Sequence, residues 1–249
     1  MLAETETDTI NLPDLPDLPP MRDTRPRQIL ARSKKSGAAA QVNSGALLSF
    51  DASLPQQARD DISNSILFCQ LAADKKFDRT TDPQDWKNSF ASTLSIVGWI
   101  VQGISNTSST SRDAVDWGEL ATSPMSSSAA RLANEAIGAC SDLPSGAEAI
   151  LIWNEAAVGV ASATFIIAAS AASGNSVPLN LSICGFQTAA PDEGFLEWGL
   201  EYRIDQTYLG LTLNEAVYAT VRQTIIDKLG DRPEYLVAEV ELPRLASEG

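Results

Sequence analysis

The chain has 249 residues, and 44% of them are hydrophobic, which is enough for a sizeable core in one large domain. Its formal net charge of −14 argues against a nucleic-acid-binding surface, because contacts to phosphates need clustered Lys and Arg. It contains no histidine, which excludes Ser-His-Asp and Cys-His nucleophile systems and histidine-containing zinc sites.

The three cysteines, Cys69, Cys140 and Cys184, are far apart and form no CxxC pair. This spacing predicts neither structural zinc nor a disulfide framework, and it fits a reducing compartment or export without cysteine pairing. No GxGxxG or GxxxxGK[ST] motif marks a phosphate-binding loop. We therefore expect no cofactor and no metal.

Residues 1–44 differ in composition from the remainder and predict an extended or disordered arm. Acidic residues come first, PDLPDLPP follows, and basic residues come last, among them Arg22, Arg25, Arg27 and Arg32. Proline disfavours a helical residue before it and lacks an amide donor. The arm is interpreted as a flexible tail, or as a docking segment that orders on a sister subunit or a secretion carrier through those arginines. Residues 45–249 are expected to form a single domain.

The N-terminus shows no signal peptide, because residues 1–20 are acidic and proline-rich and have no apolar stretch. We expect a chain that is cytoplasmic as made and that can be exported without a cleaved signal peptide.

Two helices are predicted in the first half of the domain. The first begins near SLPQQARDD, where Ser53 and Gln56 have capping-box spacing. The second begins at Asp82-Pro83 and ends at Gly98. Its apolar positions, spaced for one buried face, are Trp86, Phe90, Leu94 and Val97. WIVQGIS then predicts a strand.

The second half of the domain predicts mainly strands. Residues 105–128 are rich in Ser and Thr and predict a loop, and SSAARLANEAIGAC predicts a third helix. Strands are expected in ILIWNEAAVGVASATFIIAASAASG, VPLNLSICGFQT and FLEWGLEYRIDQTYLGL, the first two around a Gly174-Asn175 turn. Thr212 and Glu215 form a capping box for a last helix that stops at Gly230, and YLVAEVEL closes the domain. The predicted fold is α+β, with N-terminal helices and a C-terminal helix packed on a mainly antiparallel sheet.

The stretches SILFCQLAADKKFDRTTDPQDWKNSFASTLSIVGWIVQG and LNEAVYATVRQTIIDKLGD resemble the Evf-type family of bacterial and fungal proteins, the Erwinia virulence factor-like proteins. The resemblance spans roughly residues 50–242. It implies an α/β fold with no demonstrated enzymatic activity, an association with persistence in an insect gut, and membrane attachment through a lipidated cysteine. That cysteine is not assigned to Cys69, Cys140 or Cys184, so no functional residue is carried over.

The charged stretch CQLAADKKFDRTTDPQDW is the first candidate site. Its alternating acids and bases are typical of a solvated connector between two helices, whose exposed ion pairs contribute about 0–1 kcal/mol each. The alternative is a partner-binding surface made by Lys75, Lys76, Asp78 and Arg79.

Cys184 is the second candidate. A free thiol in a strand either packs in the core or is a lipidated or reactive group. The five tryptophans, Trp86, Trp99, Trp117, Trp153 and Trp198, are expected to be core or edge anchors rather than a ligand box. Glu155 lies inside an apolar run with no second carboxylate at a defined spacing, so it predicts no glycosidase-like pair.

Three functions follow from these observations. The leading one is a non-enzymatic, virulence- or toxin-associated protein that binds a lipid membrane, a host protein or an assembly. The second is a structural or secreted cargo protein, a homo-oligomer or a carrier-bound chain, that docks through its N-terminal arm. The third is a hydrolase that uses carboxylates, or Ser and Lys, without histidine.

Overall fold

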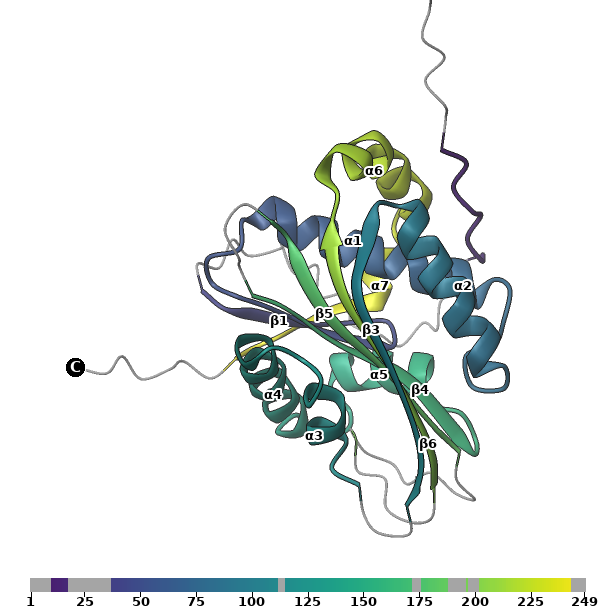
Figure 1. Ribbon diagram of the computed structural model, residues 1–249, viewed down its shortest axis with the longest axis vertical. Helices are drawn as coiled ribbons and strands as arrows, with labels where there is room; N and C mark the ends of the chain where they lie inside the picture. The colour runs from purple at the N-terminus through teal and green to yellow at the C-terminus, as the bar shows by residue number, and fades with distance from the viewer. Residues whose placement is uncertain are drawn as a thin grey trace, which may run out of the picture.

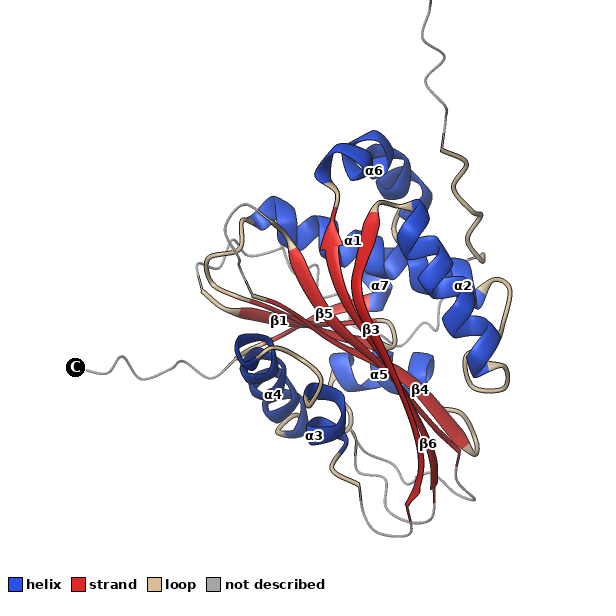
Figure 2. Ribbon diagram, viewed as in Figure 1, coloured by secondary structure: helices blue, strands red, loops and turns tan. Residues whose placement is uncertain are grey.

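The computed structural model describes residues 10–17, 37–111, 115–171, 176–187, 196 and 202–242. Within these residues the chain forms a seven-stranded, mostly antiparallel sheet with helices on both faces, as Figures 1 and 2 show. The predicted α+β fold is confirmed.

The strands are β1 (Ala39–Asn43), β2 (Ala46–Phe50), β3 (Trp99–Ser111), β4 (Ser162–Ser170), β5 (Pro178–Gln187), β6 (Tyr202–Leu213) and β7 (Val237–Val240). The helices are α1 (Gln56–Asp74), α2 (Pro83–Ile96), α3 (Trp117–Thr122), α4 (Ser127–Ser141), α5 (Glu148–Ala157), α6 (Glu215–Leu229) and α7 (Arg232–Leu236).

The strand order across the sheet is β3-β6-β5-β4-β2-β1-β7. All neighbouring pairs are antiparallel except β2 and β4, which run parallel with Ala46 opposite Ile166. Every residue of β2 is buried, as expected for a strand that is covered on both faces. The two edges differ greatly, because β3 has thirteen residues and β7 has four.

Each face of the sheet has its own hydrophobic core. One core joins the sheet to α1, α2 and α6 and contains Trp86, Trp99 and Tyr218. The other joins it to α3, α4 and α5 and contains Trp117 and Trp153. These four tryptophans are at most 2% exposed, so their prediction as core anchors is confirmed, and Trp198 lies outside the described residues.

Three sequence-based boundaries were wrong. Strand β1 lies inside the stretch assigned to the arm, so the sheet begins before residue 44. The predicted loop 105–128 contains the second half of β3, all of α3 and the start of α4. ILIWNEAA forms helix α5 instead of a strand, because apolar residues that lie against the sheet can do so in either conformation.

Both predicted capping boxes are absent, although both helices exist. Ser53 bonds to the Asp51 carboxylate, and Pro55 occupies the N-cap position of α1 without a side-chain cap. Thr212 lies in β6, and Asn214 caps α6 by accepting a bond from the Val217 amide. The Gly174-Asn175 turn lies outside the described residues.

Candidate interaction surface

The predicted partner surface lies in the turn that follows α1. Residues 74–80 line an open pocket of about 480 Å³, and the other wall comes from Glu155, Ala156 and Val158 at the end of α5. Two segments about 80 residues apart in sequence therefore form one concave surface. The sequence identified the first wall, and it singled out Glu155 without connecting it to that wall.

Arg79 belongs to the floor of this pocket and not to its surface. Its side chain is only 4% exposed, its Nε and Nη2 atoms donate to both Asp74 oxygens at 3.0 and 2.6 Å, and Nη1 donates to Gln70 at 3.1 Å. The guanidinium lies 4.5 Å from the Trp86 ring centroid, and the Trp86 indole N–H also donates to Asp74 at 2.7 Å. Arg79 was grouped with surface residues, but its donors are used internally.

A chain of buried polar contacts continues from Arg79 toward the sheet. Gln70 donates to the backbone carbonyl of Asn43 at 2.9 Å, and Asn43 donates to the backbone carbonyl of Ser63 at 3.0 Å. Gly45 makes room for this arrangement, because a Cβ atom at that position would lie 2.0 Å from Nη1 of Arg79. The turn after α1 is thereby fixed to the β1–β2 hairpin.

Asp78 organises the turn itself. Its Oδ1 atom accepts bonds from the Thr80 amide and hydroxyl, both at 2.7 Å, and from the Thr81 amide at 3.1 Å. These bonds, the Thr80 hydroxyl first, lower the pKa of Asp78. The Ser162 hydroxyl donates to the Thr80 carbonyl at 2.8 Å and joins the turn to the start of β4. Asp78 thus shapes the rim of the pocket.

An N-terminal segment, residues 10–17, docks beside this turn. Leu12 is 5% exposed in the core on the α1 side of the sheet, and Ile10 and Leu15 pack partly buried against the same core. In Figure 1 the segment is the dark purple trace at the margin of the helical layer. This part of the predicted arm therefore contacts the domain of its own chain.

Three basic side chains hold the docked segment, and we call them the basic cradle: Lys75, Lys228 and Arg232. Lys75 donates to the Leu15 carbonyl at 3.0 Å, Lys228 pairs with Asp14 at 2.9 Å, and Arg232 donates to the Pro16 carbonyl. Lys228 lowers the pKa of Asp14, first by hydrogen bonding and then by its charge. The cradle comes from the turn after α1, from α6 and from α7. It receives an acidic segment in a chain whose net charge is −14.

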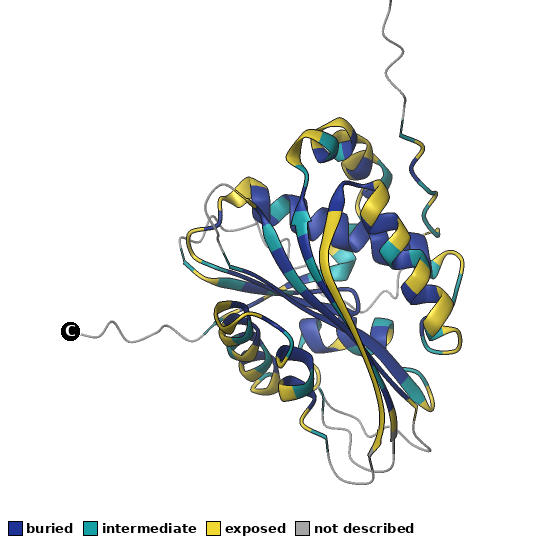
Figure 3. Ribbon diagram, viewed as in Figure 1, coloured by how far each residue is buried: buried dark blue, intermediate teal, exposed yellow. Residues whose placement is uncertain are grey.

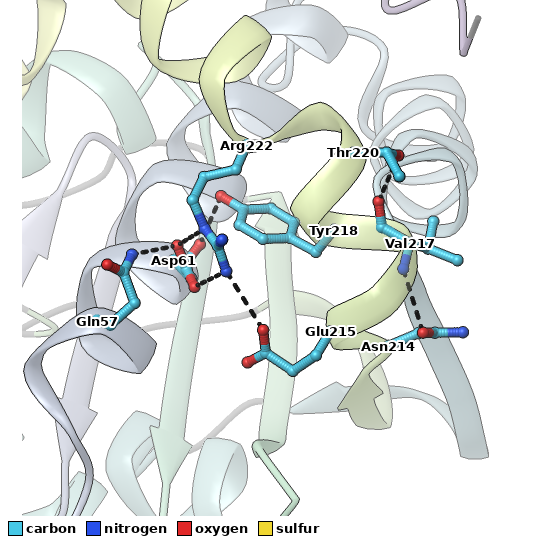
Figure 4. A network of polar contacts seen from close by, with 8 residues as sticks. All are labelled: Gln57, Asp61, Asn214, Glu215, Val217, Tyr218, Thr220 and Arg222. Atoms are coloured by element: carbon cyan, nitrogen blue, oxygen red, sulfur yellow. Dashed lines mark hydrogen bonds and ion pairs between the residues drawn. The ribbon is translucent and has the colours of Figure 1, made fainter. Parts of the chain in front are cut away.

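An ion pair between α1 and α6 fixes the position of the cradle (Figure 4). Arg222 donates from Nε and Nη2 to the two oxygens of Asp61 at 2.9 and 2.8 Å, and Asp61 is 1% exposed. Gln57 donates to Asp61 at 2.9 Å, and the Tyr218 hydroxyl donates to the Asp61 carbonyl at 3.2 Å. Glu215 accepts a second bond from Arg222 at 3.3 Å. These contacts orient α6, which carries Lys228.

Cys184 lies in β5 and is fully buried in the core on the α3–α5 side. Burial raises the pKa of its thiol to about 12, and the charge of Lys87 opposes this shift. Cys69 and Cys140 are also buried, and burial raises the pKa values of their thiols. In this conformation all three thiols are protonated and enclosed, so lipidation or reactivity of Cys184 stays a prediction that requires the strand to open.

Asp74 and Asp78 in the pocket do not form an acid–base pair. Both Asp74 oxygens are bonded to Arg79, and the pKa of Asp78 is lowered, whereas a general acid at neutral pH needs a raised pKa. Over the ranges that the structure describes, no three Cys, Asp or Glu side chains meet to hold a metal ion. No helix within those ranges combines the length and the apolar character needed to cross a bilayer.

The sequence predicts part of this surface. Lys75, Lys76 and Asp78 lie at the pocket, whereas Arg22, Arg25, Arg27 and Arg32 lie outside the described residues. It missed Leu12 and Asp14 as docking residues and Lys228 and Arg232 as their receptors. The repeated Leu-Pro-Asp spacing of LPDLPDLPP was the available signal, since it alternates an apolar side chain with an acidic one in a proline-rich segment.

Comparison with known proteins finds a likeness in structure but no match in sequence. No protein-family model matches the chain, and no curated protein sequence matches it significantly. The solved "Structure of the Evf virulence factor" is similar to it with 15% sequence identity and a TM-score of 0.35. The matched region covers 78% of this chain and 85% of that one. This likeness agrees with the resemblance found in the sequence and carries no argument about activity.

Proposed function

We propose that the chain is a non-enzymatic association protein whose basic cradle binds an acidic, leucine- and proline-containing segment. The observation that carries the proposal is the docking of residues 10–17 on Lys75, Lys228 and Arg232. The segment supplies an apolar anchor, Leu12, and an acidic side chain, Asp14, and the domain supplies a core and a basic rim. The same segment of a neighbouring copy has the same chemistry, so exchange of arms joins copies into an assembly.

The strength of the contact comes mainly from its apolar part. Full burial of a leucine side chain contributes about 1.5–3 kcal/mol, whereas an exposed ion pair contributes about 0–1 kcal/mol. The Asp14 side chain is 84% exposed, so its pair with Lys228 sets orientation more than affinity. A contact of this size is stable when the segment is tethered and can still exchange.

The tether allows docking on either copy. Residues 18–36 connect the docked segment to the first strand, and a stretch of that length spans at most about 65 Å when fully extended. Because so few residues join the segment to its own domain, its effective concentration near its own cradle is in the millimolar range, which favours docking within one chain when the protein is dilute. Docking between chains is favoured where the copies are concentrated.

Two copies with complementary defects test the exchange. Leu12→Ser/Leu15→Ser weakens the segment and keeps the cradle, and Lys75→Glu/Lys228→Glu weakens the cradle and keeps the segment. Mixing them leaves one intact segment and one intact cradle, so Förster transfer between labelled copies is expected to rise above that of either variant mixed with itself. The transfer measured when each variant is mixed with itself reports any other contact between copies, and it is subtracted as the baseline.

Lys76→Glu is the matched control for the cradle. Lys76 is adjacent to Lys75 and exposed, and its side chain forms no hydrogen bond or ion pair with another described residue. A copy with this change should give the same Förster transfer as the parent protein does. Equal transfer in the complementary mixture and in the self-mixtures would refute arm exchange.

The membrane and host-component versions of the function stay predictions, and so does an association with virulence or toxins. Flotation of the full chain with liposomes, with and without acylation, tests the membrane version, and absence of co-flotation would contradict it. The hydrolase alternative gains no support from Asp74, whose two oxygens are bonded to Arg79, or from Asp78, whose pKa is lowered.

A further inference from the structure

The free edge of strand β3 is a long uncharged surface feature that the proposed function does not use. Every residue from Ile100 to Thr110 is exposed, and Figure 3 shows this run as a yellow stripe along one margin of the sheet. The strand pairs with β6 from Trp99 to Ser111, and within the described chain it has no strand neighbour on its other side. Its outward-facing backbone groups are available for another strand.

Proteins usually protect an exposed edge strand against pairing with another chain. Of the two edge strands described here, β7 has such features and β3 has almost none. A short strand, charged side chains, proline and bulges all prevent edge-to-edge pairing. Strand β7 has four residues and is followed by Glu241, and it contains Glu239. Strand β3 has thirteen residues, contains no charged residue and no proline, and its ladder has a single irregularity between Val101 and Gly103.

The side chains of the edge are also suited to strand pairing. Val101 lies opposite Leu211 and Ile104 lies opposite Leu209, so these two exposed apolar side chains share one face. Ile104 is 63% exposed and Val101 is 45% exposed. The remainder of the strand is mostly Ser and Thr, whose cross-strand pairs stabilise a sheet by about 0.2–1 kcal/mol each.

We propose that β3 pairs antiparallel with β3 of a second copy, which joins two sheets into one continuous sheet about a two-fold axis. A second copy fits this edge because it presents an identical uncharged strand. Although two molecules of charge −14 repel each other, a contact line about 40 Å long without charged residues lets them meet without bringing carboxylates together along it. Antiparallel pairing of identical strands is self-complementary, so the contact closes at two copies. It does not rest on arm exchange, because residues 10–17 dock on the α1 side, against the cradle.

Sedimentation of the full chain from low micromolar to near millimolar concentration tests the pairing. The parent protein is expected to form a concentration-dependent dimer. Ile104→Lys/Ser108→Lys places two positive charges on one face of the edge, and four meet in the dimer, so the dissociation constant should rise at least tenfold. The charge-matched control is Val160→Lys/Ile226→Lys, which changes two exposed apolar residues away from the edge, 94% and 40% exposed.

Spin labels on Ser105, Ser108 and Thr110 test the geometry of the dimer. In antiparallel pairing the distance between equivalent positions grows by about 7 Å per residue away from the two-fold axis, because each strand contributes about 3.4 Å. A monomer at all concentrations overturns the proposal. It is also overturned by a dimer that both double variants weaken equally, or by label distances that do not change with position. The arm-defective variant Leu12→Ser/Leu15→Ser should dimerise as the parent does, which separates this contact from arm exchange.

Discussion

Arg222 on α6 forms a two-point ion pair with Asp61 on α1, with nitrogen–oxygen distances of 2.9 and 2.8 Å. Asp61 is almost fully buried, and Gln57 donates a third bond to its carboxylate. A planar guanidinium that meets a carboxylate through two parallel bonds fixes both distance and direction. The pair therefore sets the position of α6 over α1, and with it the position of Lys228.

Asp61→Asn is expected to destabilise the fold by about 3 kcal/mol. Removal of one partner from a buried pair leaves the other uncompensated, which typically costs about 3–5 kcal/mol. The lower end applies because the Arg222 side chain is 28% exposed and can reach water. Urea unfolding measures the change. Glu215→Gln is the control: Glu215 is 52% exposed and accepts only one long bond, so its loss should cost about 0–1 kcal/mol. Equal effects of the two substitutions would contradict this role for Asp61.

Gly45→Ala tests the buried position of Arg79. An added Cβ would lie 2.0 Å from Nη1, so the guanidinium or the hairpin must move, and overpacking of this kind costs about 1–3 kcal/mol. In an Arg79→Ala background the same methyl group has room, and the cost of Gly45→Ala should fall by at least about 1 kcal/mol. A double-mutant cycle of unfolding free energies measures the difference.

The matched glycine control for that cycle is Gly138→Ala in α4. A Cβ at position 138 meets nothing within 4 Å, and alanine favours a helix over glycine, so this change should stabilise the fold by about 0.5–1 kcal/mol. If Gly45→Ala costs the same with and without Arg79, the close approach of the two residues is not what excludes a side chain.

Local patterns predicted the helices better than the strands. The spacing of Trp86, Phe90 and Leu94 identified α2 correctly, because a helix that packs on a sheet buries one face with a period near 3.6. The apolar run ILIWNEAA was assigned to a strand and forms α5, since a short apolar run does not distinguish a buried strand from a buried helix.

The polarity of the Ser- and Thr-rich half of β3 predicts a solvent-exposed loop. The exposure is confirmed, and the loop is wrong. Its conformation is nevertheless set by hydrogen bonding to β6, about 100 residues away in the sequence. The contact between the docked segment and helices α6 and α7 was missed for the same reason. Lys228, Arg232 and Leu12 meet only through tertiary packing, and no local pattern in the sequence connects them.

The lowered pKa of Asp78 predicts a specific dependence of stability on pH. The folded state holds this pKa below the ordinary value of 3.8, so it binds the proton less tightly than the unfolded chain does. The stabilisation is therefore fully present above about pH 4 to 5 and is lost as the pH falls through the folded pKa. Asp78→Asn removes the titration. The difference in Tm between the parent protein and this variant should be largest near neutral pH and should shrink below pH 4. A difference that grows on acidification would contradict the assignment.

The buried thiols predict that the native protein resists thiol reagents. Burial raises the pKa values of Cys140 and Cys184 to about 12, and the thiolate is the reactive form. At pH 8 an aromatic disulfide reagent should modify none of the three cysteines rapidly in the folded chain and all three in urea. Any slow native labelling should follow the rate at which the sheet opens. Mass spectrometry identifies the first residue to react. Rapid labelling of Cys184 in the native protein would show that β5 opens readily, and it would favour the modified-thiol interpretation over core packing.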